Sequence, residues 1–295
     1  MKNFLCTVVL FVILFLISGC GGKAVKDDKE TYDYDAYAHP KQFHAIDVTS
    51  ILSVSVIRPE RKWRVSYNPE KDTEVFYSAW EIAEGYQTTR MADISSVRTL
   101  FEAVEVLSKS CQGEEPVQNE EGEPEIIVVY EDKIEQEILS VKFSFENLPE
   151  GALAIGSLTA FDMILKLPVL ENLDDLSGVE LYFDNRKVNL NRQKESWMLN
   201  GKEITQEKAK DLYQIILGIL LQGETESLAM PSATKETGFL DVHYVRKDGK
   251  VVKVMFGPPV DGRCQVNIDG IEEFWVCEKD VENIICTMEN ALESL

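Results

Sequence analysis

Residues 197–219 read WMLNGKEITQEKAKDLYQIILGI, a segment that combines a strand candidate with a capped helix. Trp197–Leu199 forms the short apolar strand candidate, and the hydroxyl of Thr205 can cap the helix that follows it. Beyond Thr205 the apolar residues recur at spacings of three and four, which is the period of an amphipathic helix. That apolar face consists of Ala209, Leu212, Tyr213, Ile216 and Ile219.

This pattern has a counterpart earlier in the chain, and the apolar faces of the two helices match at an offset of 112 residues. A strand candidate over residues 75–82 contains Trp80, and Asp93 or Ser95 caps a helix with the matching apolar face Val97, Leu100, Phe101, Val104 and Leu107. Further on, apolar residues match at offsets of 113 or 114: Ile126, Val128, Tyr130, Val141, Phe143, Leu153, Ile155 and Phe161 with Leu240, Val242, Tyr244, Val254, Phe256, Val266, Ile268 and Phe274. The preserved order of strands and helix favours an internal duplication.

The remaining patterns predict short strands and tight turns. Strand candidates cover residues 52–57, 63–67, 179–183 and 188–190, and hairpin-type turns fall at Asp184-Asn185, Asp248-Gly249 and Asp269-Gly270. A helical segment is expected to close each copy, at residues 165–173 and 280–292. The expected fold class is α+β, with two tandem repeats of mostly antiparallel strands and packed amphipathic helices, over residues 46–173 and 174–295.

The N-terminus predicts where in the cell the protein is located. Lys2 precedes an apolar run from Phe4 to Leu16, and Ile17-Ser18-Gly19-Cys20 then resembles the lipobox of bacterial lipoproteins. We therefore expect residues 1–19 to be a signal peptide and Cys20 to be the lipidated N-terminus of the mature protein, facing the extracytoplasmic side of the cell membrane. The alternatives are an ordinary secretory signal or an uncleaved anchor, for which the run is short.

Residues 20–45 are polar and contain little aliphatic material, so they are expected to form a flexible tether. The whole chain has 30 basic and 51 acidic residues, a formal net charge of −21. That balance disfavours binding to nucleic acid or directly to an anionic lipid surface, because both require clustered Lys and Arg. Membrane attachment would then depend on the lipid, and the favoured protein partner would present a basic face.

Four cysteines follow Cys20 in the chain, namely Cys111, Cys264, Cys277 and Cys286. Their spacing contains no CxxC pair and fits no zinc site. Cys264 and Cys277 flank Asp269-Gly270 within two strand candidates, so a hairpin could place them opposite each other as a disulfide. Two unpaired buried thiols remain an equal alternative.

No catalytic motif occurs in the chain: there is no nucleophile elbow, HExxH, P-loop or glycine-rich dinucleotide turn. His243 lies on a strand candidate and is expected to be a packed or surface residue. Carboxylates are abundant, yet no spacing singles out a catalytic pair. The acidic residues 114–125 are expected to form an exposed loop. We therefore expect a protein that is not an enzyme and that has no metal site and no cofactor.

The second copy resembles the bacterial domain of unknown function 4340. The resemblance rests on the strands ending in Trp197-Met198-Leu199-Asn200-Gly201, the helix from Thr205 to Leu221, and the strand pair Val251–Gly257 and Cys264–Val276. The first copy departs from this pattern, since Ser144 stands where the second has Gly257. The resemblance implies an envelope protein, in a family with members encoded near ABC-type transport systems of the gliding-motility auxiliary kind.

Together these patterns predict a lipid-anchored, non-catalytic envelope protein that serves as an accessory or scaffold of a membrane transport complex. A ligand-binding lipoprotein is the first alternative, although a two-lobed solute-binding protein would show parallel, continuously apolar strands. A carboxylate-based envelope hydrolase is the second alternative.

Overall fold

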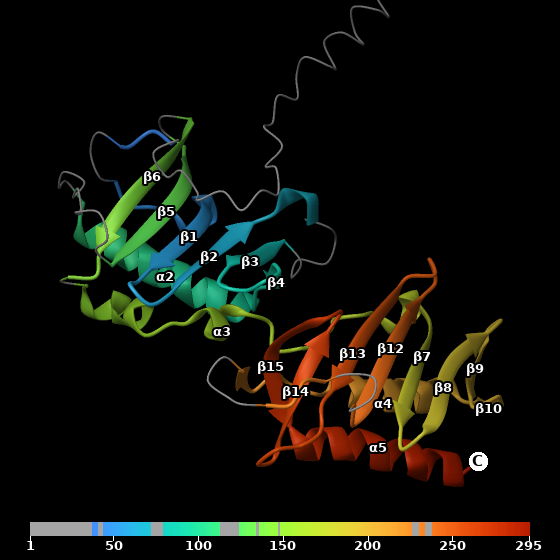
Figure 1. Cartoon of the computed structure of the whole chain (residues 1–295). Coiled ribbons are helices and arrows are strands. Elements are labelled where there is room, and N and C mark those ends of the chain that lie inside the picture. Colours follow the sequence, from blue (N-terminus) through green and yellow to red (C-terminus); the bar gives the residue numbers. More distant parts are fainter. Residues whose placement is uncertain are drawn as a thin grey trace, which may run out of the picture. The chain divides into compact units, whose positions relative to one another are not determined.

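A computed structural model describes residues 37–40, 44–71, 79–112, 124–133, 136–146, 148–225, 230–233 and 238–295. The expected signal peptide, Cys20 and most of the expected tether lie outside the described residues. Residues from Ala38 to Leu295 form one compact unit that contains two sheets (Figure 1). The strands are mostly antiparallel and helices pack on them, so the expected α+β class is confirmed.

The first sheet has the strand order β4-β3-β2-β1-β5-β6, and neighbouring strands pair antiparallel. Its strands are β1 (Ile51–Ile57), β2 (Lys62–Tyr67), β3 (Trp80–Glu84), β4 (Arg90–Met91), β5 (Glu125–Asp132) and β6 (Glu137–Ser144). Helix α2 (Ile94–Ser110) begins at Asp93, whose carboxylate accepts a hydrogen bond from the backbone N–H of Ser96 at 2.9 Å. Asp93 is thus the cap rather than Ser95, and the expected apolar face of α2 is buried.

The second sheet has the order β10-β9-β8-β7-β12-β13-β14-β15-β11. Its strands are β7 (Leu176–Phe183), β8 (Arg186–Gln193), β9 (Ser196–Leu199), β10 (Lys202–Ile204), β11 (Gly223–Glu224), β12 (Leu240–Arg246), β13 (Val251–Phe256), β14 (Arg263–Ile268) and β15 (Ile271–Cys277). Helix α4 (Gln206–Leu217) is capped by Thr205, which accepts from the N–H of Lys208 at 3.1 Å, as expected. Helix α5 (Glu278–Glu293) ends the chain.

The three expected hairpin turns are confirmed. Asp184 and Asn185 both have positive φ, at 47° and 58°, and Asp269 and Gly270 follow the same pattern at 50° and 96°. Two consecutive residues with positive φ are the signature of a type I′ turn, whose twist suits an antiparallel hairpin. These turns fix the register of β7 on β8 and of β14 on β15.

Two expectations about the end of the first copy are wrong. Residues 165–173 are not helical before the short 3-10 helix η6 (Leu173–Asp175), because Pro168 lacks an N–H and biases Leu167 toward an extended backbone. Three of the eight downstream matches also fail as equivalents. Leu153 and Ile155 lie in the 3-10 helix η5 (Glu150–Gly156) and Phe161 in helix α3 (Ala160–Met163), whereas their expected counterparts lie in β14 and β15.

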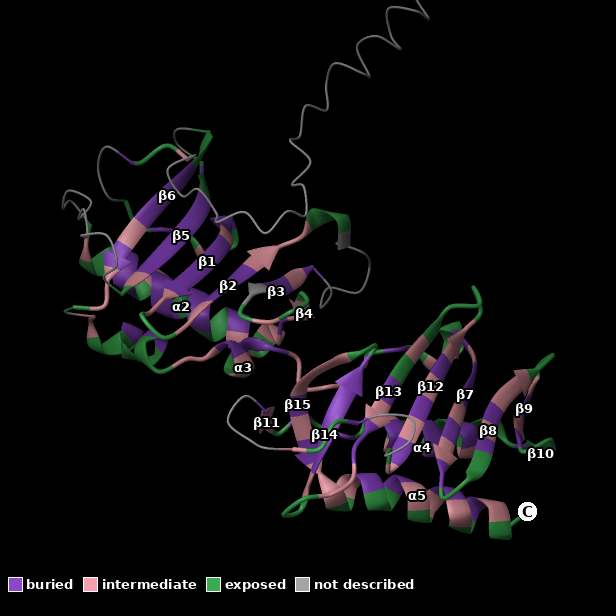
Figure 2. Ribbon diagram, viewed as in Figure 1, coloured by how far each residue is buried: buried purple, intermediate pink, exposed green. Residues whose placement is uncertain are grey.

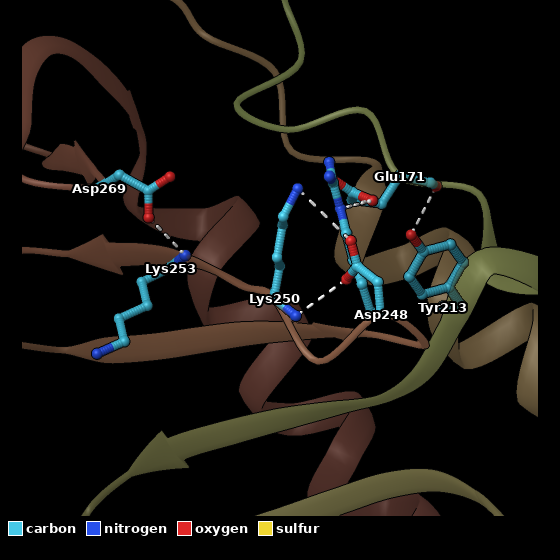
Figure 3. A network of polar contacts seen from close by, with 7 residues as sticks. Glu171, Tyr213, Asp248, Lys250, Lys253 and Asp269 are labelled. Atoms are coloured by element: carbon cyan, nitrogen blue, oxygen red, sulfur yellow. Dashed lines mark hydrogen bonds and ion pairs between the residues drawn. The ribbon is translucent and has the colours of Figure 1, made fainter.

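The extended connector after Pro168 is anchored to the second sheet by Glu171 (Figure 3). The Glu171 side chain is buried, and its carboxylate accepts a fork of hydrogen bonds from the guanidinium of Arg246 on β12. The backbone carbonyl of Glu171 accepts the hydroxyl of Tyr213 on α4 at 2.7 Å. One connector residue therefore binds both a strand and a helix. Burial raises the pKa of Tyr213, so its hydroxyl keeps the proton that it donates to Glu171.

The two sheets of the unit also share a set of ion pairs. Arg61 donates to both carboxylate oxygens of Glu224 at 2.6 and 2.7 Å, and the hydroxyl of Tyr86 donates to the same carboxylate at 2.7 Å. Arg90 pairs with Glu273 at 3.0 Å. Bidentate and half-buried arginine pairs of this kind fix geometry more strongly than fully exposed ion pairs do.

We predict that Glu171→Ala lowers the free energy of unfolding by about 1 to 3 kcal/mol, because Arg246 loses the buried carboxylate that accepts its hydrogen bonds, whereas the bond from Tyr213 to the backbone carbonyl is kept. Thermal or urea denaturation followed by circular dichroism measures this loss. Asp174→Ala, an exposed position three residues further along, is the control and should change stability by less than about 0.5 kcal/mol. Equal effects of the two substitutions would contradict the anchoring role.

Candidate functional site

The second sheet has two unlike faces, and one of them carries the candidate site. Helices α4 and α5 contact each other and pack on one face, where every second strand residue is buried, as the alternating bands of β7 and β12 show in Figure 2. We name the opposite side the outward face. It is defined by the side chains of the alternate positions: Glu180, Tyr182, Lys187, Asn189, Asp241, His243, Lys253, Met255, Gln265 and Asn267.

Strand register arranges most of these side chains in two adjacent rows. In the first row Tyr182 lies opposite both Lys187 and Asp241, and the row continues through Met255 to Asn267. In the second row Glu180 lies opposite Asn189 and His243, and His243 lies opposite Lys253. Directly opposed side chains on one face lie within contact distance, so residues from five strands form one polar surface.

Glu180 is held by two donors. Lys187 donates to one carboxylate oxygen at 2.8 Å, and the hydroxyl of Tyr182 donates to the other at 2.5 Å. The hydrogen bond from Lys187 is the larger cause that lowers the pKa of Glu180, and the Tyr182 hydroxyl adds to it. The same bond raises the pKa of Lys187. Glu180 therefore stays ionised at neutral pH, which is the opposite of what a general acid requires.

His243 contacts a carboxylate and an aromatic ring. Its Nε2 lies 3.6 Å from a carboxylate oxygen of Asp241, and its ring centroid lies 5.0 Å from that of Tyr182. The side chains of His243 and Asp241 are 20% and 18% exposed. Among the described residues, no serine, threonine or cysteine side chain forms a hydrogen bond with His243. The arrangement orients an imidazole at a surface rather than assembling a nucleophile and its base.

Two amide oxygens on the outward face lack a donor within the described structure. The Oδ1 of Asn189 and the Oε1 of Gln265 are both buried and accept no hydrogen bond. Gln265 is only 7% exposed, and it lies opposite Trp275 of β15. A buried acceptor without a donor costs about 1 to 3 kcal/mol.

Helix α5 presents a second charged feature, which we name the acidic stripe. Glu278, Glu282, Glu289 and Glu293 are separated by four, seven and four residues, close to whole helical turns, so they lie on one side of α5. Glu282 and Glu293 are exposed, and Glu289 pairs with Arg186 at 2.5 Å. The opposite side of α5 packs on the sheet through Val281, Ile284, Met288 and Ala291.

Cys264 and Cys277 lie on neighbouring antiparallel strands, β14 and β15, but both are free thiols in the structure. Cys264 is opposite Val276, and Cys277 is opposite Arg263, so the two thiols occupy positions that alternate between faces of the sheet. Of the two alternatives left open by the sequence, a disulfide or two unpaired thiols, the structure has the unpaired thiols. Cys111 and Cys286 are free as well, and the described residues contain no group of three metal-ligating side chains.

Sequence reasoning singled out His243 but not its neighbours. Glu180 and Tyr182 come from β7 and Lys187 from β8, more than fifty residues before His243 in the chain. The polar positions that alternate with Val179 and Leu181 were the available signal for an exposed face. Only the register of β7 on β12 identifies which of them meet His243.

We predict that the four described thiols differ sharply in reactivity. Burial raises the pKa of Cys264 to about 12, with smaller contributions from Glu278 and Glu282, so this thiol should stay protonated and unmodified in the folded protein. Cys286 is exposed and should react first with a thiol reagent, as peptide mapping by mass spectrometry would show. Rapid labelling of Cys264 without unfolding would contradict this assignment.

Because the pKa of Cys264 is raised in the folded protein, this thiol also makes the free energy of unfolding depend on pH. An unfolded cysteine ionises near pH 8.5, whereas the folded one keeps its proton, so this stabilisation is complete below about pH 8.5 and is lost as pH rises toward 12. Cys264→Val should flatten part of the alkaline decline in the unfolding free energy, whereas Cys286→Ser, at an exposed position, should leave it unchanged.

Comparison with family models, with curated proteins and with solved structures found no match to this chain.

Proposed function

We propose that this chain is a lipid-anchored extracytoplasmic protein that works by binding another envelope protein and turns over no substrate. The observation that carries the proposal is the acidic stripe of α5, a set of carboxylates on one side of a helix whose other side is firmly packed. A rigid, charged and solvent-facing helix is suited to contact with a basic partner surface.

The anchor is supported by the sequence from Lys2 to Cys20. Among the described residues, no helix has the length and apolar character needed to span a membrane. A lipid on Cys20 would confine the folded unit near the bilayer. Confinement raises the effective concentration of a membrane partner, so an interface of modest affinity is sufficient.

The partner we propose is a component of a membrane transport complex, as the family resemblance implies. With a net charge of −21, the chain favours a basic partner face, and opposite charges speed the encounter. Exposed carboxylates are screened by salt, so binding through the acidic stripe should weaken as ionic strength rises.

We also propose that the two halves are tandem copies. The orders β4-β3-β2-β1-β5-β6 and β10-β9-β8-β7-β12-β13 run through equivalent positions, and Trp80 on β3 corresponds to Trp197 on β9, which supports a common topology. The second copy continues into β14, β15 and α5, where the first has η5 and α3. The acidic stripe thus belongs to a part that only the second copy has.

A ligand-binding lipoprotein is the second candidate, and the donor-free amide oxygens of Asn189 and Gln265 are the observation that favours it. The hydrolase alternative would need one carboxylic acid with a raised pKa beside an ionised partner. On the outward face the Lys187 hydrogen bond lowers the pKa of Glu180 instead, which argues against that chemistry there.

We predict that Cys20→Ser releases the protein from membranes or leaves an unprocessed precursor. The substitution removes the thiol that would carry the lipid, and fractionation with mass spectrometry of the N-terminus reads out both results. Cys6→Ser, inside the expected signal, is the control and should be processed normally. An unmodified Cys20 in the native protein would refute the lipoprotein assignment.

We predict that a photo-crosslinking residue at exposed position Cys286 captures a specific envelope protein in intact cells. Reversing Glu282 and Glu293 to lysine should reduce capture several-fold, because each exposed ion pair contributes about 0.2 to 1 kcal/mol. Glu195→Lys with Glu207→Lys makes the same change in net charge elsewhere and should have little effect. Capture of no specific protein, or equal loss in both double variants, would overturn the proposed docking surface.

A further inference from the structure

The outward face is polar but carries little net charge. Among its row residues, Lys187 and Lys253 offset Glu180 and Asp241. A strongly charged ligand would find no excess of opposite charge there. An anionic ligand would in addition be repelled by the chain as a whole, whose net charge is −21.

The same composition is a poor core for a protein interface. The centre of such interfaces is depleted in Lys, Glu and Asp, because burying them against a partner costs more hydration than the contacts return. A ligand that stays partly hydrated, and that offers both donors and acceptors, avoids this cost. Hydroxyl groups have that property, since each can donate one hydrogen bond and accept others.

The two amide oxygens that lack a donor indicate that the ligand should supply hydrogen-bond donors. Asn189 lies opposite Glu180 in the second row, and its Oδ1 accepts no hydrogen bond in the described structure. Gln265, two residues before Asn267 on β14, places a second such acceptor on the same face. The terminal torsion of an amide side chain is broad, so a small rotation can turn the Asn189 oxygen toward an incoming hydroxyl.

Tyr182 gives the face an apolar element beside these polar groups. Its hydroxyl is engaged by Glu180, which fixes the ring next to His243 at a centroid distance of 5.0 Å. The Nζ of Lys187 lies over this ring, 5.2 Å from its centroid, so a sugar ring that packs on Tyr182 takes the place of the exposed Lys187 side chain there. Lys253 is exposed at the end of the second row and is available as a donor.

We propose that the outward face binds a neutral oligosaccharide along the row of Asn189, Glu180, His243 and Lys253. Sugar hydroxyls donate to the Oδ1 of Asn189 and accept from Lys253 and His243, and a sugar ring packs on Tyr182. This inference goes beyond the proposed docking of a protein on α5 and does not depend on it. The two surfaces lie on different elements and differ in salt dependence, because a neutral ligand is not screened.

The test uses the full chain, purified in a detergent without a sugar head group, on an array of neutral and anionic oligosaccharides that includes cellotetraose, maltotetraose and chitotetraose. We expect retention of at least one neutral oligosaccharide, with an affinity that does not change between low and high salt. Titration calorimetry with that oligosaccharide then measures the variants. Failure to retain any neutral oligosaccharide, or retention of anionic ones alone, overturns the proposal.

Asn189→Leu should weaken binding about tenfold, since it removes one hydrogen bond at a desolvated site. Tyr182→Ala should weaken it at least as much, whereas Tyr182→Phe keeps the ring and should retain binding. Asn290→Leu makes the matched change on exposed α5 and should bind like the unmodified chain. An affinity of Asn189→Leu that equals that of the Asn290→Leu control, with native circular dichroism for both variants, overturns the proposal, as does equal binding by Tyr182→Ala and Tyr182→Phe when both are folded.

Discussion

The second sheet depends on one constraint: its strands must bury every second side chain under α4 and α5. That requirement fixes the register, because a shift of one residue would exchange the two faces of a strand and expose Val179 and Leu181. The same constraint also determines which side chains form the polar rows of the outward face. Once Leu181 faces the helices, Glu180 and Tyr182 must stand on the opposite side, where β12 supplies His243 and Asp241. The candidate site is thus a consequence of core packing.

Local chemistry made much of the fold predictable. Thr205 was identified as a helix cap from its side chain and the period that follows it, and Asp184-Asn185 as a turn from residues that tolerate positive φ. The prediction went wrong where one residue overrode a pattern. Leu165 to Leu173 has a helix-like apolar content, but Pro168 within it removes a backbone donor and extends the chain.

The candidate site was less predictable, because it depends on pairings between distant strands. The alternation around Glu180 indicates that one face is exposed but not which strand lies beside it. Cys264 and Cys277 illustrate the same point. Their neighbouring strands could be predicted from the turn between them, whereas a one-residue offset in register decides that Cys264 meets Val276 and not the other cysteine. Side-chain contacts across a sheet require the register as well as the pattern.

The anchoring of Glu171 has a consequence for the order in which the chain acquires its structure. Glu171 and Arg246 are 75 residues apart, so their pairing must wait until β12 has been synthesised. The strands of the first sheet end at Ser144 and can pair before that point. The connector is thus fixed late, which gives the first half time to fold before it is tied to the second.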